Sequence, residues 1–367
     1  MKKIERVIIS GGGTGGHIFP AIAIADEIKR RNPEADILFV GAEGKMEMEK
    51  VPAAGYPIEG LRIVGLKRKF ALSNFLLPFK VIASLLKARR IVKKFRPQVA
   101  VGVGGYASGP TLKAATMLGV PSLIQEQNAF AGKTNKILGR NVAKICVAYD
   151  GLERFFPAEK IILTGNPTRK DMVAIAGKEE EGYEFYGFDP KKKTILILGG
   201  SLGARTLNES VLAQFDELLA SGVQVLWQCG KLYSHAIENT LNNKPMGSIQ
   251  LVEFIARMDF AYAIADIVIS RAGAISVSEL CLVHKPTILV PSPNVAEDHQ
   301  TKNAMALVEK DAAILVKDVD AQKTLIQTAL SLLGNEARCA ELSRNIRALG
   351  KPMATSDIVN ELEKLVK

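Results

Sequence analysis

Residues 6–17 read RVIISGGGTGGH, a short apolar run that passes directly into a glycine loop. The same order of residue types returns at 194–204, TILILGGSLGA. Alignment of the two stretches pairs glycine with glycine and hydroxyl with hydroxyl: Gly12 with Gly199, Gly13 with Gly200, Thr14 with Ser201 and Gly16 with Gly203. Apolar runs without polar alternation are typical of parallel strands that are covered on both faces. The repeat therefore predicts two domains that each open with a strand, a glycine turn and a helix.

Further short apolar runs alternate with helical patterns in both halves of the chain. They lie at residues 36–40, 98–103 and 122–125 in the first half, and at 223–227, 267–270 and 286–290 in the second. With 367 residues, the chain also has the length of two ordinary domains. These features predict an α/β fold in which two Rossmann-like, doubly wound parallel-sheet domains face each other across a cleft. We place the boundary after residue 164, where Pro, Gly and polar residues begin to interrupt the pattern.

The composition indicates a soluble globular protein with an anionic partner. No window reaches about 18 uncharged apolar residues, and the first apolar run is too short for a signal peptide, so we expect a cytoplasmic chain. The four cysteines lack the spacing of a zinc or redox site and are expected to be free thiols. The formal net charge is +10, and no acidic residue lies between Glu59 and Glu126. This basic region favours nucleic acid, a lipid headgroup or a phosphorylated substrate as the partner.

The loop Gly11–His17 has the residues that an anion cradle requires. Glycines let the backbone approach a phosphate closely, and the start of the following helix offers N–H groups and a partial positive charge. The loop also fits the dinucleotide fingerprint G-x-G-x-x-G. Val40 and Gly41 occupy the place of the acid that this fingerprint needs about 20 residues later, and Glu43 lies beyond them. A tight turn without a ligand is the structural alternative.

His17 follows this loop at the predicted entrance of a helix. Because a helix N-terminus disfavours imidazolium, we expect a neutral histidine that can accept a proton or donate one to an oxygen. Helix capping, or packing against Phe19, is the structural alternative, and the residues alone do not separate the two.

Three other loops follow predicted strands and precede predicted helices. Gly104–Pro110 concentrates glycines around Tyr106 and should lie beside the first loop at the same sheet edge. Ser270–Glu279 offers amides for a diphosphate and, in Glu279, an acceptor for ribose hydroxyls. Pro291–Ala304 brings carboxylates and amides to a helix start, where they suit sugar hydroxyls. Tight turns, an exposed helix acid and helix capping are the respective alternatives.

A helical pattern in the basic region separates an apolar stripe from a basic side. We expect the stripe to face the core: Leu77, Val81, Leu85, Ala88 and Val92. The other side combines apolar and basic residues that suit an anionic membrane surface: Phe75, Leu76, Phe79, Lys80 and Lys87. A merely solvated basic face is the alternative. We expect no nucleic-acid partner, because aromatic residues do not interleave with the charges.

Seven motifs, in this order over nearly the whole chain, resemble the MurG family of peptidoglycan glycosyltransferases, within glycosyltransferase family 28. They are GGTGGHIFP at 12–20, GGYASGP at 104–110, QEQN at 125–128, GNPTR at 165–169, GGSLGA at 199–204, residues 270–279 and DHQ at 298–300. The family transfers N-acetylglucosamine from UDP-GlcNAc to lipid I, undecaprenyl-pyrophosphoryl-MurNAc-pentapeptide, forming lipid II. The resemblance implies this inverting reaction, the GT-B fold, and a peripheral place on the cytoplasmic face of the cell (inner) membrane. It implies no cofactor and no metal fixed by the fold.

The resemblance also implies a role for each domain and its residues. Residues 1–164 would bind the acceptor and the membrane, residues 165–352 would bind UDP-GlcNAc, and a helix at 353–367 would pack back on the first domain. The implied donor contacts are Thr14, Gly15, Gly16, Asn128, Arg169, Ser201, Ile255, Ala274, Ile275, Ser276, Val277, Ser278, Glu279 and Gln300. Ile255 would face the uracil and Glu279 the ribose. The implied acceptor contacts are Gly13, Gly104, Gly105 and Tyr106.

One position departs from the family pattern. Many relatives have histidine before Glu-Gln-Asn, where this chain has Gln125, so a base at that position is excluded. His17 is then the expected proton acceptor for the C4 hydroxyl of the muramoyl sugar, while amides of the second domain would stabilise departing UDP. Three other functions stay open: another UDP-sugar-dependent GT-B enzyme, an NAD(P)-binding oxidoreductase, and a nucleotide-sugar sensor without activity.

Overall fold

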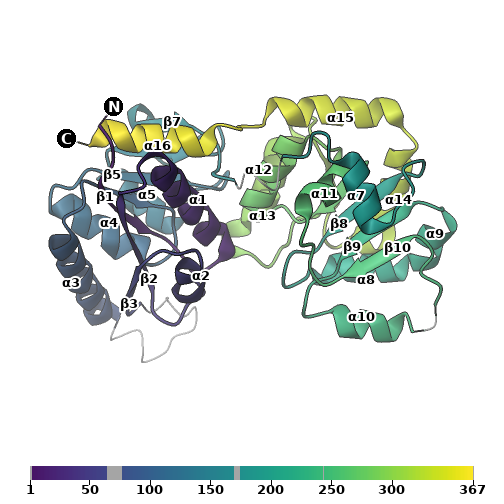
Figure 1. The fold of residues 1–367 in the computed structure, drawn as a ribbon, viewed down its shortest axis with the longest axis horizontal. Helices are drawn as coiled ribbons and strands as arrows, with labels where there is room; N and C mark the ends of the chain where they lie inside the picture. Colours follow the sequence, from purple (N-terminus) through teal and green to yellow (C-terminus); the bar gives the residue numbers. More distant parts are fainter. Residues whose placement is uncertain (1, 64–76, 169–173, 243, 367) are drawn as a thin grey trace. The chain divides into compact units, whose positions relative to one another are not determined.

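The computed structural model describes residues 2–63, 77–168, 174–242 and 244–366 (Figure 1). The chain divides into two compact units. The first consists of Met1–Thr168 together with Lys351–Lys367, and the second of Arg169–Gly350. The chain thus leaves the first unit after Thr168, close to the boundary placed at residue 164, and re-enters it at Lys351.

The first unit is built, within its described residues, on a seven-stranded parallel sheet with the order β3-β2-β1-β4-β5-β6-β7. The strands are β1 (Arg6–Ser10), β2 (Asp36–Ala42), β3 (Ile58–Leu61), β4 (Val99–Gly102), β5 (Ser122–Glu126), β6 (Lys144–Val147) and β7 (Ile161–Leu163). On β1, Val7 and Ile9 join one apolar cluster and Ile8 joins another, since successive side chains point to opposite faces. Burial of both faces explains why this strand is apolar throughout.

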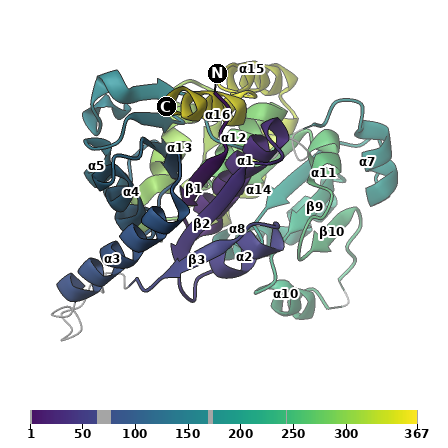
Figure 2. The same ribbon diagram turned by 60° about the vertical axis from the view of Figure 1, so that its left-hand side comes forward.

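Helices cover both faces of this sheet (Figure 2). On one face, α1 (Gly15–Arg31) and α16 (Ala354–Leu365) bring Ile24 and Ile358 into the cluster around Val7. On the other face, α3 (Leu77–Phe95) and α4 (Ser108–Met117) pack Ala88 and Ala115 around Ile8. The shorter elements are α2 (Glu47–Ala53), α5 (Lys133–Gly139), and the 3-10 turns η2 (Leu152–Arg154) and η3 (Ala158–Lys160).

The C-terminal helix α16 lies beside α1 and is part of the first core (Figure 1). Its residues Ile358, Val359 and Leu362 are completely buried there. Arg31, in the last turn of α1, donates to Asn360 Oδ1 at 2.7 Å and pairs with Glu363 at 3.1 Å. A basic residue in the last turn also complements the helix dipole of α1. The core of the first unit therefore contains residues that precede the second unit in the sequence and residues that follow it.

The second unit contains, within its described residues, a six-stranded parallel sheet with the order β10-β9-β8-β11-β12-β13. The strands are β8 (Thr194–Leu198), β9 (Gln224–Gln228), β10 (Ile249–Val252), β11 (Ile267–Ser270), β12 (Thr287–Leu289) and β13 (Ile314–Leu315). The surrounding elements are α7 (Glu179–Tyr186), α8 (Arg205–Ala213), α9 (Phe215–Ala220), α10 (Ser234–Thr240), α11 (Met258–Ile264), α12 (Ala274–Val283), η4 (Ala296–Asp298), α13 (His299–Val308), α14 (Ala321–Leu333) and α15 (Glu336–Ala348). Its core includes Trp227, whose indole N–H donates to Asn208 Oδ1 at 2.9 Å.

Both sheets reverse their strand order at one place. In the first unit the chain runs outward from β1 to β3 and then returns to place β4 on the other side of β1. In the second unit β8 and β11 have the same relationship. Loops that follow the two strands at such a reversal diverge, and ligands of open α/β sheets bind in the crevice between them. Each unit thus has one such crevice position, beyond β1 and β4 or beyond β8 and β11.

Within the described ranges, no helix combines the length and the apolar character that crossing a membrane requires.

Candidate active site

The first glycine loop connects β1 to α1 and is held from several sides. Gly13 has φ +87°, a conformation that favours glycine. Ser108 Oγ donates to the carbonyl of Ser10 at 3.0 Å, which ties the end of β1 to α4. Helix α1 begins at Gly15, so its first N–H groups lack partners within the helix and point toward the loop side. A ligand beyond β1 would meet these amides first.

Glu47 is a buried acid that supports this loop and that the sequence reasoning missed. Its carboxylate is 1% exposed and accepts hydrogen bonds from the Gly13 N–H at 2.8 Å and the Ala42 N–H at 2.9 Å. The N–H of Gly13 is therefore directed at Glu47. A bound acceptor substrate would contact Gly13 through the Cα atom of this glycine instead. No sequence pattern marks Glu47, since it lies outside the position where the dinucleotide fingerprint places its acid.

His17 lies in the first turn of α1 and is half-buried. Its Nδ1 is 3.1 Å from the carbonyl oxygen of Gly12 and 3.4 Å from Thr14 Oγ1. A carbonyl oxygen can only accept, so Nδ1 carries the hydrogen and the lone pair of the neutral ring lies on Nε2. A Cβ atom on Gly104 would lie 2.8 Å from Nε2, so glycine at that position leaves room for this edge of the ring. The arrangement fits a proton acceptor that acts through Nε2.

The loop after β4 lies against the first loop, which confirms the prediction that the two share a sheet edge. A Cβ atom on Gly105 would lie only 2.3 Å from the carbonyl oxygen of Gly12, so the two backbones are in direct contact. Gly104 and Gly105 both have positive φ, +96° and +83°. Tyr106, which follows them, is 61% exposed and is available to a ligand on the outer side of the loop.

The segment after β5 forms a buried network of amides. Gln125 is completely buried and donates to Asn166 Oδ1 at 2.9 Å, and Asn166 in turn donates to the carbonyl of Gln127 at 3.0 Å. Glu126 accepts from the backbone of Asn128 and from Asn135 Nδ2 at 2.8 Å. Gln125 therefore ties the QEQN and GNPTR motifs together, a structural role consistent with the absence of a base at this position.

The second glycine loop connects β8 to α8 and resembles the first only in part. The Gly200 N–H donates to Gln228 Oε1 at 3.0 Å, where Gly13 uses Glu47. The helix of this copy begins at Arg205, two residues after its last glycine, whereas α1 begins at Gly15 inside the motif. Gly203 lies close to another segment, since a Cβ there would lie 2.3 Å from the carbonyl oxygen of Cys229. Ser201 lies exposed at the tip of the loop.

Helix α12 starts directly beyond β11, on the other side of the reversal. Its first residues Ala274, Ile275 and Ser276 are half-buried, and Gly273 precedes the helix in an extended conformation. Val277 is buried and donates its N–H to the Gly273 carbonyl at 2.9 Å, so it stabilises the helix start. Ser278 likewise donates to the carbonyl of Ala274, at 3.1 Å. A helix start of this kind combines N–H donors with a partial positive charge, which favours an anion.

Three further predicted donor contacts, Glu279, Ile255 and Gln300, lie beyond other strands of the second sheet. Burial, and to a lesser extent the charge of Glu279, raises the pKa of Tyr262. Ile255 follows β10 and is buried, so it contributes a firm apolar surface. Gln300 accepts from the Ser292 N–H at 2.8 Å and so holds the loop after β12. Because parallel strands end at one edge, these residues gather at the same side of the sheet.

A second network that the sequence reasoning missed supports this edge. Arg271, between β11 and α12, donates to the Val290 carbonyl at 2.9 Å and forms an ion pair with Asp318. Asp318 also accepts from Thr206 Oγ1 in α8, at 3.0 Å. The starts of α8 and α12 are thereby tied to the same carboxylate.

Two models of sequence families match the chain. The model of the glycosyltransferase family 28 N-terminal domain matches residues 7–147, and that of the glycosyltransferase family 28 C-terminal domain matches residues 194–361. The chain belongs to glycosyltransferase family 28. The two glycine loops open the two matched regions.

Full-length relatives within this family have a specific name. A Parabacteroides distasonis protein named UDP-N-acetylglucosamine--N-acetylmuramyl-(pentapeptide) pyrophosphoryl-undecaprenol N-acetylglucosamine transferase is 55% identical over 361 residues, 98% of this chain and 98% of that protein. A Bacteroides fragilis protein of the same name is 56% identical over 99% of this chain and 96% of its own length. The crystal structure of Acinetobacter baumannii MurG is 31% identical, with a TM-score of 0.82 over 98% of this chain and 99% of that chain.

These similarities confirm the GT-B fold and the resemblance to the MurG family that the motifs predicted. They do not favour an NAD(P)-binding oxidoreductase, although the first loop of this family 28 chain fits the dinucleotide fingerprint.

Several predicted residues of the family 28 chain fall outside the described part of the structure. Arg169, Phe75 and Leu76 lie in stretches that are not described, and so does the side chain of Phe79. The described part of the predicted membrane surface is α3 from Lys80 onward.

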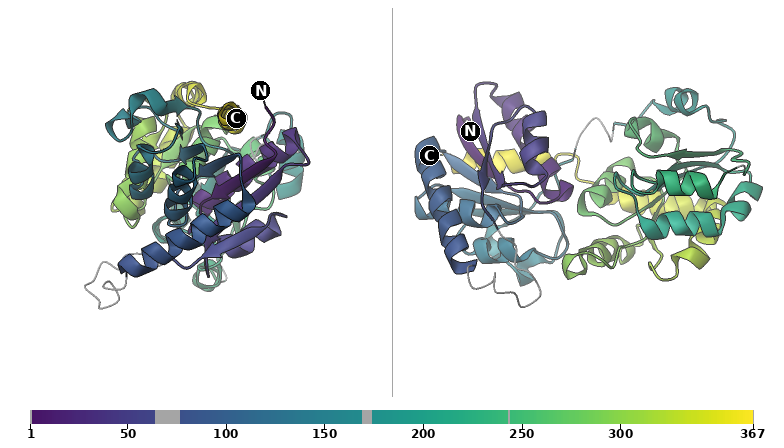
Figure 3. Two further views of the ribbon diagram at one scale, coloured as in Figure 1. Left: turned by 90° about the vertical axis from the view of Figure 1, so that its left-hand side faces the viewer. Right: turned by 90° about the horizontal axis from the view of Figure 1, so that it is seen from below.

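Of the predicted apolar stripe of α3, the side chain of Leu77 lies outside the described part of the structure, and the prediction for the other four residues was correct except at Val81. Ala88 and Val92 are buried in the core and Leu85 packs against it. Val81, in contrast, is 56% exposed, so its placement in the core was wrong. Figures 2 and 3 show the reason: the first turns of α3 extend beyond the sheet, where none of the described strands or helices lies beneath them. Ile82 and Leu86 are exposed as well, at 55% and 58%.

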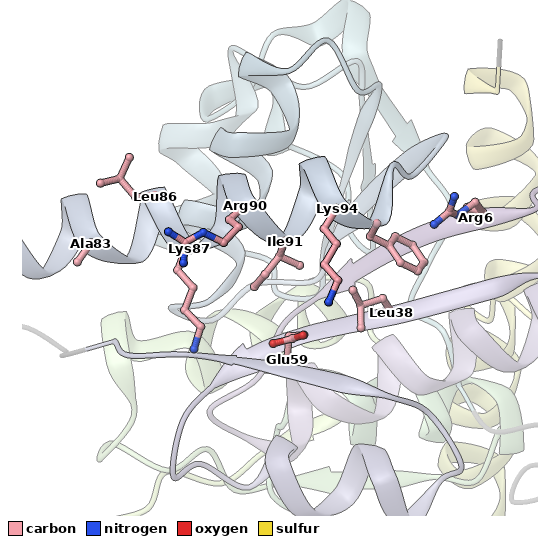
Figure 4. A pocket seen from close by; sticks show the side chains of 10 residues that line it. Arg6, Leu38, Glu59, Ala83, Leu86, Lys87, Arg90, Ile91 and Lys94 are labelled. Atoms are coloured by element: carbon pink, nitrogen blue, oxygen red, sulfur yellow. The ribbon is translucent and has the colours of Figure 1, made fainter.

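A groove of about 660 Å³ runs between α3 and strands β2 and β3 (Figure 4). Apolar side chains such as Leu38 and Ile91 line it, and Lys87, Arg90 and Lys94 lie along the helix side. Acids reach this basic surface from other elements. Lys87 pairs with Glu43 at 2.9 Å and lowers the pKa of that carboxyl, and Glu59 lies on β3 facing the helix. Although residues 60–125 contain no acid, Glu43 and Glu59 from other elements therefore lie close to the basic side chains of α3.

Proposed function

We propose that this family 28 chain transfers N-acetylglucosamine from UDP-GlcNAc to the C4 hydroxyl of the muramoyl sugar of lipid I, with inversion of the anomeric centre, to form lipid II. The full-length relatives that are more than half identical carry the name of this transferase. The observation that carries the proposal is a pair of sites at the strand reversals. One has a histidine whose ring is oriented by Gly12, and the other has the start of α12.

The donor belongs to the second unit in this proposal. N–H groups in the first turn of α12 would hold the diphosphate, since a helix start combines open donors with a partial positive charge. Glu279, one and a half turns further, would accept from the ribose hydroxyls, and Ile255 would cover the uracil. Ser201 and Gln300 would contact the phosphate and the sugar.

The acceptor belongs to the first unit. Gly13, Gly104, Gly105 and Tyr106 would contact the lipid-linked diphosphate, while the N–H groups of Thr14, Gly15 and Gly16 would reach the donor. In the reaction, His17 Nε2 takes the proton of the C4 hydroxyl while O4 attacks C1 of the donor sugar. The bond from C1 to the UDP oxygen breaks with inversion. The electron pair stays on UDP, where the α12 amides stabilise the charge. UDP leaves and the imidazolium returns its proton to solvent.

The lipid acceptor requires access to a membrane, and α3 supplies a surface for it. We propose that the chain is peripheral on the anionic, cytoplasmic face of the cell membrane. Exposed Val81, Ile82 and Leu86 stand among lysines and arginines on α3, a combination typical of helices that bind anionic lipid. The groove beside Lys87 and Arg90 would accommodate lipid headgroups and the first methylenes of their chains.

The decisive experiment measures transfer of labelled N-acetylglucosamine from UDP-GlcNAc to lipid I in detergent or vesicles, with UDP-glucose as the donor control. We expect lipid II to form with UDP-GlcNAc and little product with UDP-glucose. Tight UDP-GlcNAc binding without turnover would instead favour a sensor.

His17→Ala should lower kcat by about 10²- to 10⁴-fold, because general-base catalysis typically contributes that much. UDP affinity, measured by calorimetry, should be unchanged. His235→Ala is the matched control, since His235 lies exposed on α10. Turnover that survives His17→Ala would remove the histidine from the mechanism.

A further inference from the structure

The peptide group between Gly12 and Gly13 is held from both of its sides. Its N–H, on Gly13, donates to Glu47 Oε2 at 2.8 Å. Its carbonyl, on Gly12, lies 3.1 Å from His17 Nδ1. In a trans peptide these two groups point in opposite directions. Glu47 and His17 are thus joined through one rigid plane, although their side chains approach it from different elements, α2 and α1.

We propose that Glu47 is a positioning residue for His17: through the Gly12–Gly13 peptide it fixes the ring with the hydrogen on Nδ1 and the lone pair on Nε2. The inference rests on the proposed function in one respect, that Nε2 is the atom that takes the proton of the acceptor hydroxyl. The orientation of the ring and the identity of its tautomer are properties of the unliganded protein and are tested separately below.

The space around Glu47 is made specifically for a carboxylate. A Cβ atom on Gly12 would lie 2.2 Å from Glu47 Cδ, and one on Gly41 would lie 2.6 Å from its Cγ. Both oxygens are used, since Oε1 accepts from the Ala42 N–H at 2.9 Å. A buried carboxylate is tolerated only when hydrogen bonds compensate its lost hydration. The two backbone donors therefore hold the side chain in one position.

The physical effect on His17 follows from how a peptide group responds to its partners. A carboxylate that accepts from the N–H polarises the peptide and makes its carbonyl a stronger acceptor. The carbonyl then favours a hydrogen on Nδ1, and a hydrogen bond at one ring nitrogen decides the state of the other. Thr14 Oγ1, 3.4 Å from Nδ1, is a weaker partner because of its distance and because a hydroxyl can donate or accept.

The direct test is nitrogen NMR of the histidine rings, with His17 assigned from a His17→Gln spectrum. The chain has four histidines, so the spectrum is simple. In the wild-type protein above the titration of the ring, we expect His17 with hydrogen on Nδ1. In Glu47→Ala and Glu47→Gln, we expect a mixture that includes the Nε2–H form, larger in the alanine variant. Glu49→Gln, two residues away on the same helix and exposed, should leave the ring as in the wild type.

Two results would overturn the inference. One is a wild-type ring that carries its hydrogen on Nε2, which requires no variant and so does not depend on the variants folding. The other is a folded Glu47 variant, judged by its circular dichroism, whose His17 remains entirely in the Nδ1–H form.

Kinetics give a second readout that a general loss of structure would not imitate. Loss of an outer partner of a functional histidine typically lowers activity about 10- to 100-fold. We expect this loss in kcat for Glu47→Ala, a smaller loss for Glu47→Gln, and a KM for UDP-GlcNAc within about twofold of the wild type. A KM that rises while kcat stays constant would contradict the inference. If His17→Ala remained active while the Glu47 variants changed the tautomer, the proposed base would fail and the positioning would stand.

Discussion

Arg31 of α1 forms an ion pair with Glu363 of α16 at 3.1 Å, and the same guanidinium donates to Ser356 Oγ at 2.6 Å. The pair joins two helices from opposite ends of the chain on one face of the first sheet (Figure 1). Its side chains are 18% and 11% exposed, so solvent screens it less than a surface pair.

Arg31→Ala should therefore destabilise the first unit by about 1–3 kcal/mol, the range for removing several hydrogen bonds to a charged group. The measurement is urea unfolding of the whole chain, with hydrogen exchange to assign the loss to α1 and α16. Arg30→Ala is the matched control. Arg30 and Arg31 both pair with Glu27, but Arg30 is 65% exposed. Its effect should stay below about 1 kcal/mol. Equal losses for the two variants would show that the contacts with α16 contribute nothing.

Acid should weaken the same region through Glu27. Hydrogen bonds from Arg30 and Arg31 lower the pKa of Glu27 from 4.5 to about 2. Since the folded pKa is depressed, the stabilisation is complete above pH 4.5 and disappears as the pH falls toward 2. The free energy of unfolding of the wild type should exceed that of Glu27→Gln at pH 7, and the difference should shrink across this window. A difference that stays constant down to pH 2 would contradict the assignment.

Glu279→Ala tests the donor site without touching the acceptor site. If Glu279 accepts from the ribose, its loss should weaken UDP-GlcNAc binding about 10- to 150-fold, since a hydrogen bond to a charged group contributes roughly 1.5–3 kcal/mol. Calorimetry measures this loss. The same experiment with 2′-deoxy-UDP provides the control, because removal of the hydroxyl should weaken the wild type and have little further effect on the variant. If the loss of affinity from Glu279→Ala and the loss from removal of the ribose hydroxyl simply add, Glu279 does not contact that hydroxyl.

Ile82→Glu tests the membrane surface on α3. The change places a negative charge among the basic residues and removes an exposed apolar side chain, so binding to vesicles that contain anionic lipid should weaken about tenfold or more. Val319→Glu is the matched control, because Val319 is 83% exposed and belongs to the second unit. Cosedimentation with vesicles measures both. Equal loss in the two variants would indicate an unspecific effect of charge.

The glycine loops were predictable from sequence because their requirements are local. Positive φ, as at Gly13 and Gly200, favours glycine, and a contact as close as that of Gly105 with Gly12 leaves no room for a side chain, so glycines in the sequence mark such positions. The apolar runs recorded the parallel strands in the same way. The fold class and the place of the site at the strand reversal follow from these two signals.

The partners of the loops were not predictable, because they depend on which elements meet. Glu47 reaches Gly13 because α2 packs beside α1 and β2, and Asp318 reaches Arg271 from beyond β13. In the second loop Cys229 lies against Gly203, a contact that no alignment of the two loops reveals. On α3, helical periodicity placed Val81 on the same side of the helix as the buried Ala88 and Val92, yet Val81 is exposed. Periodicity carries no information about where the sheet beneath the helix ends.

The position of α16 has a consequence for how the protein is made. The second unit is one continuous segment, Arg169–Gly350, and its core is complete once that segment has been synthesised. The first unit, although its synthesis begins earlier, lacks Ile358, Val359 and Leu362 until residues 354–365 have been translated. Its apolar face beside α1 must therefore wait, exposed, while the ribosome produces the second unit. We therefore expect the second unit to complete its core before the first, and nascent chains halted before α16 to be those that chaperones retain.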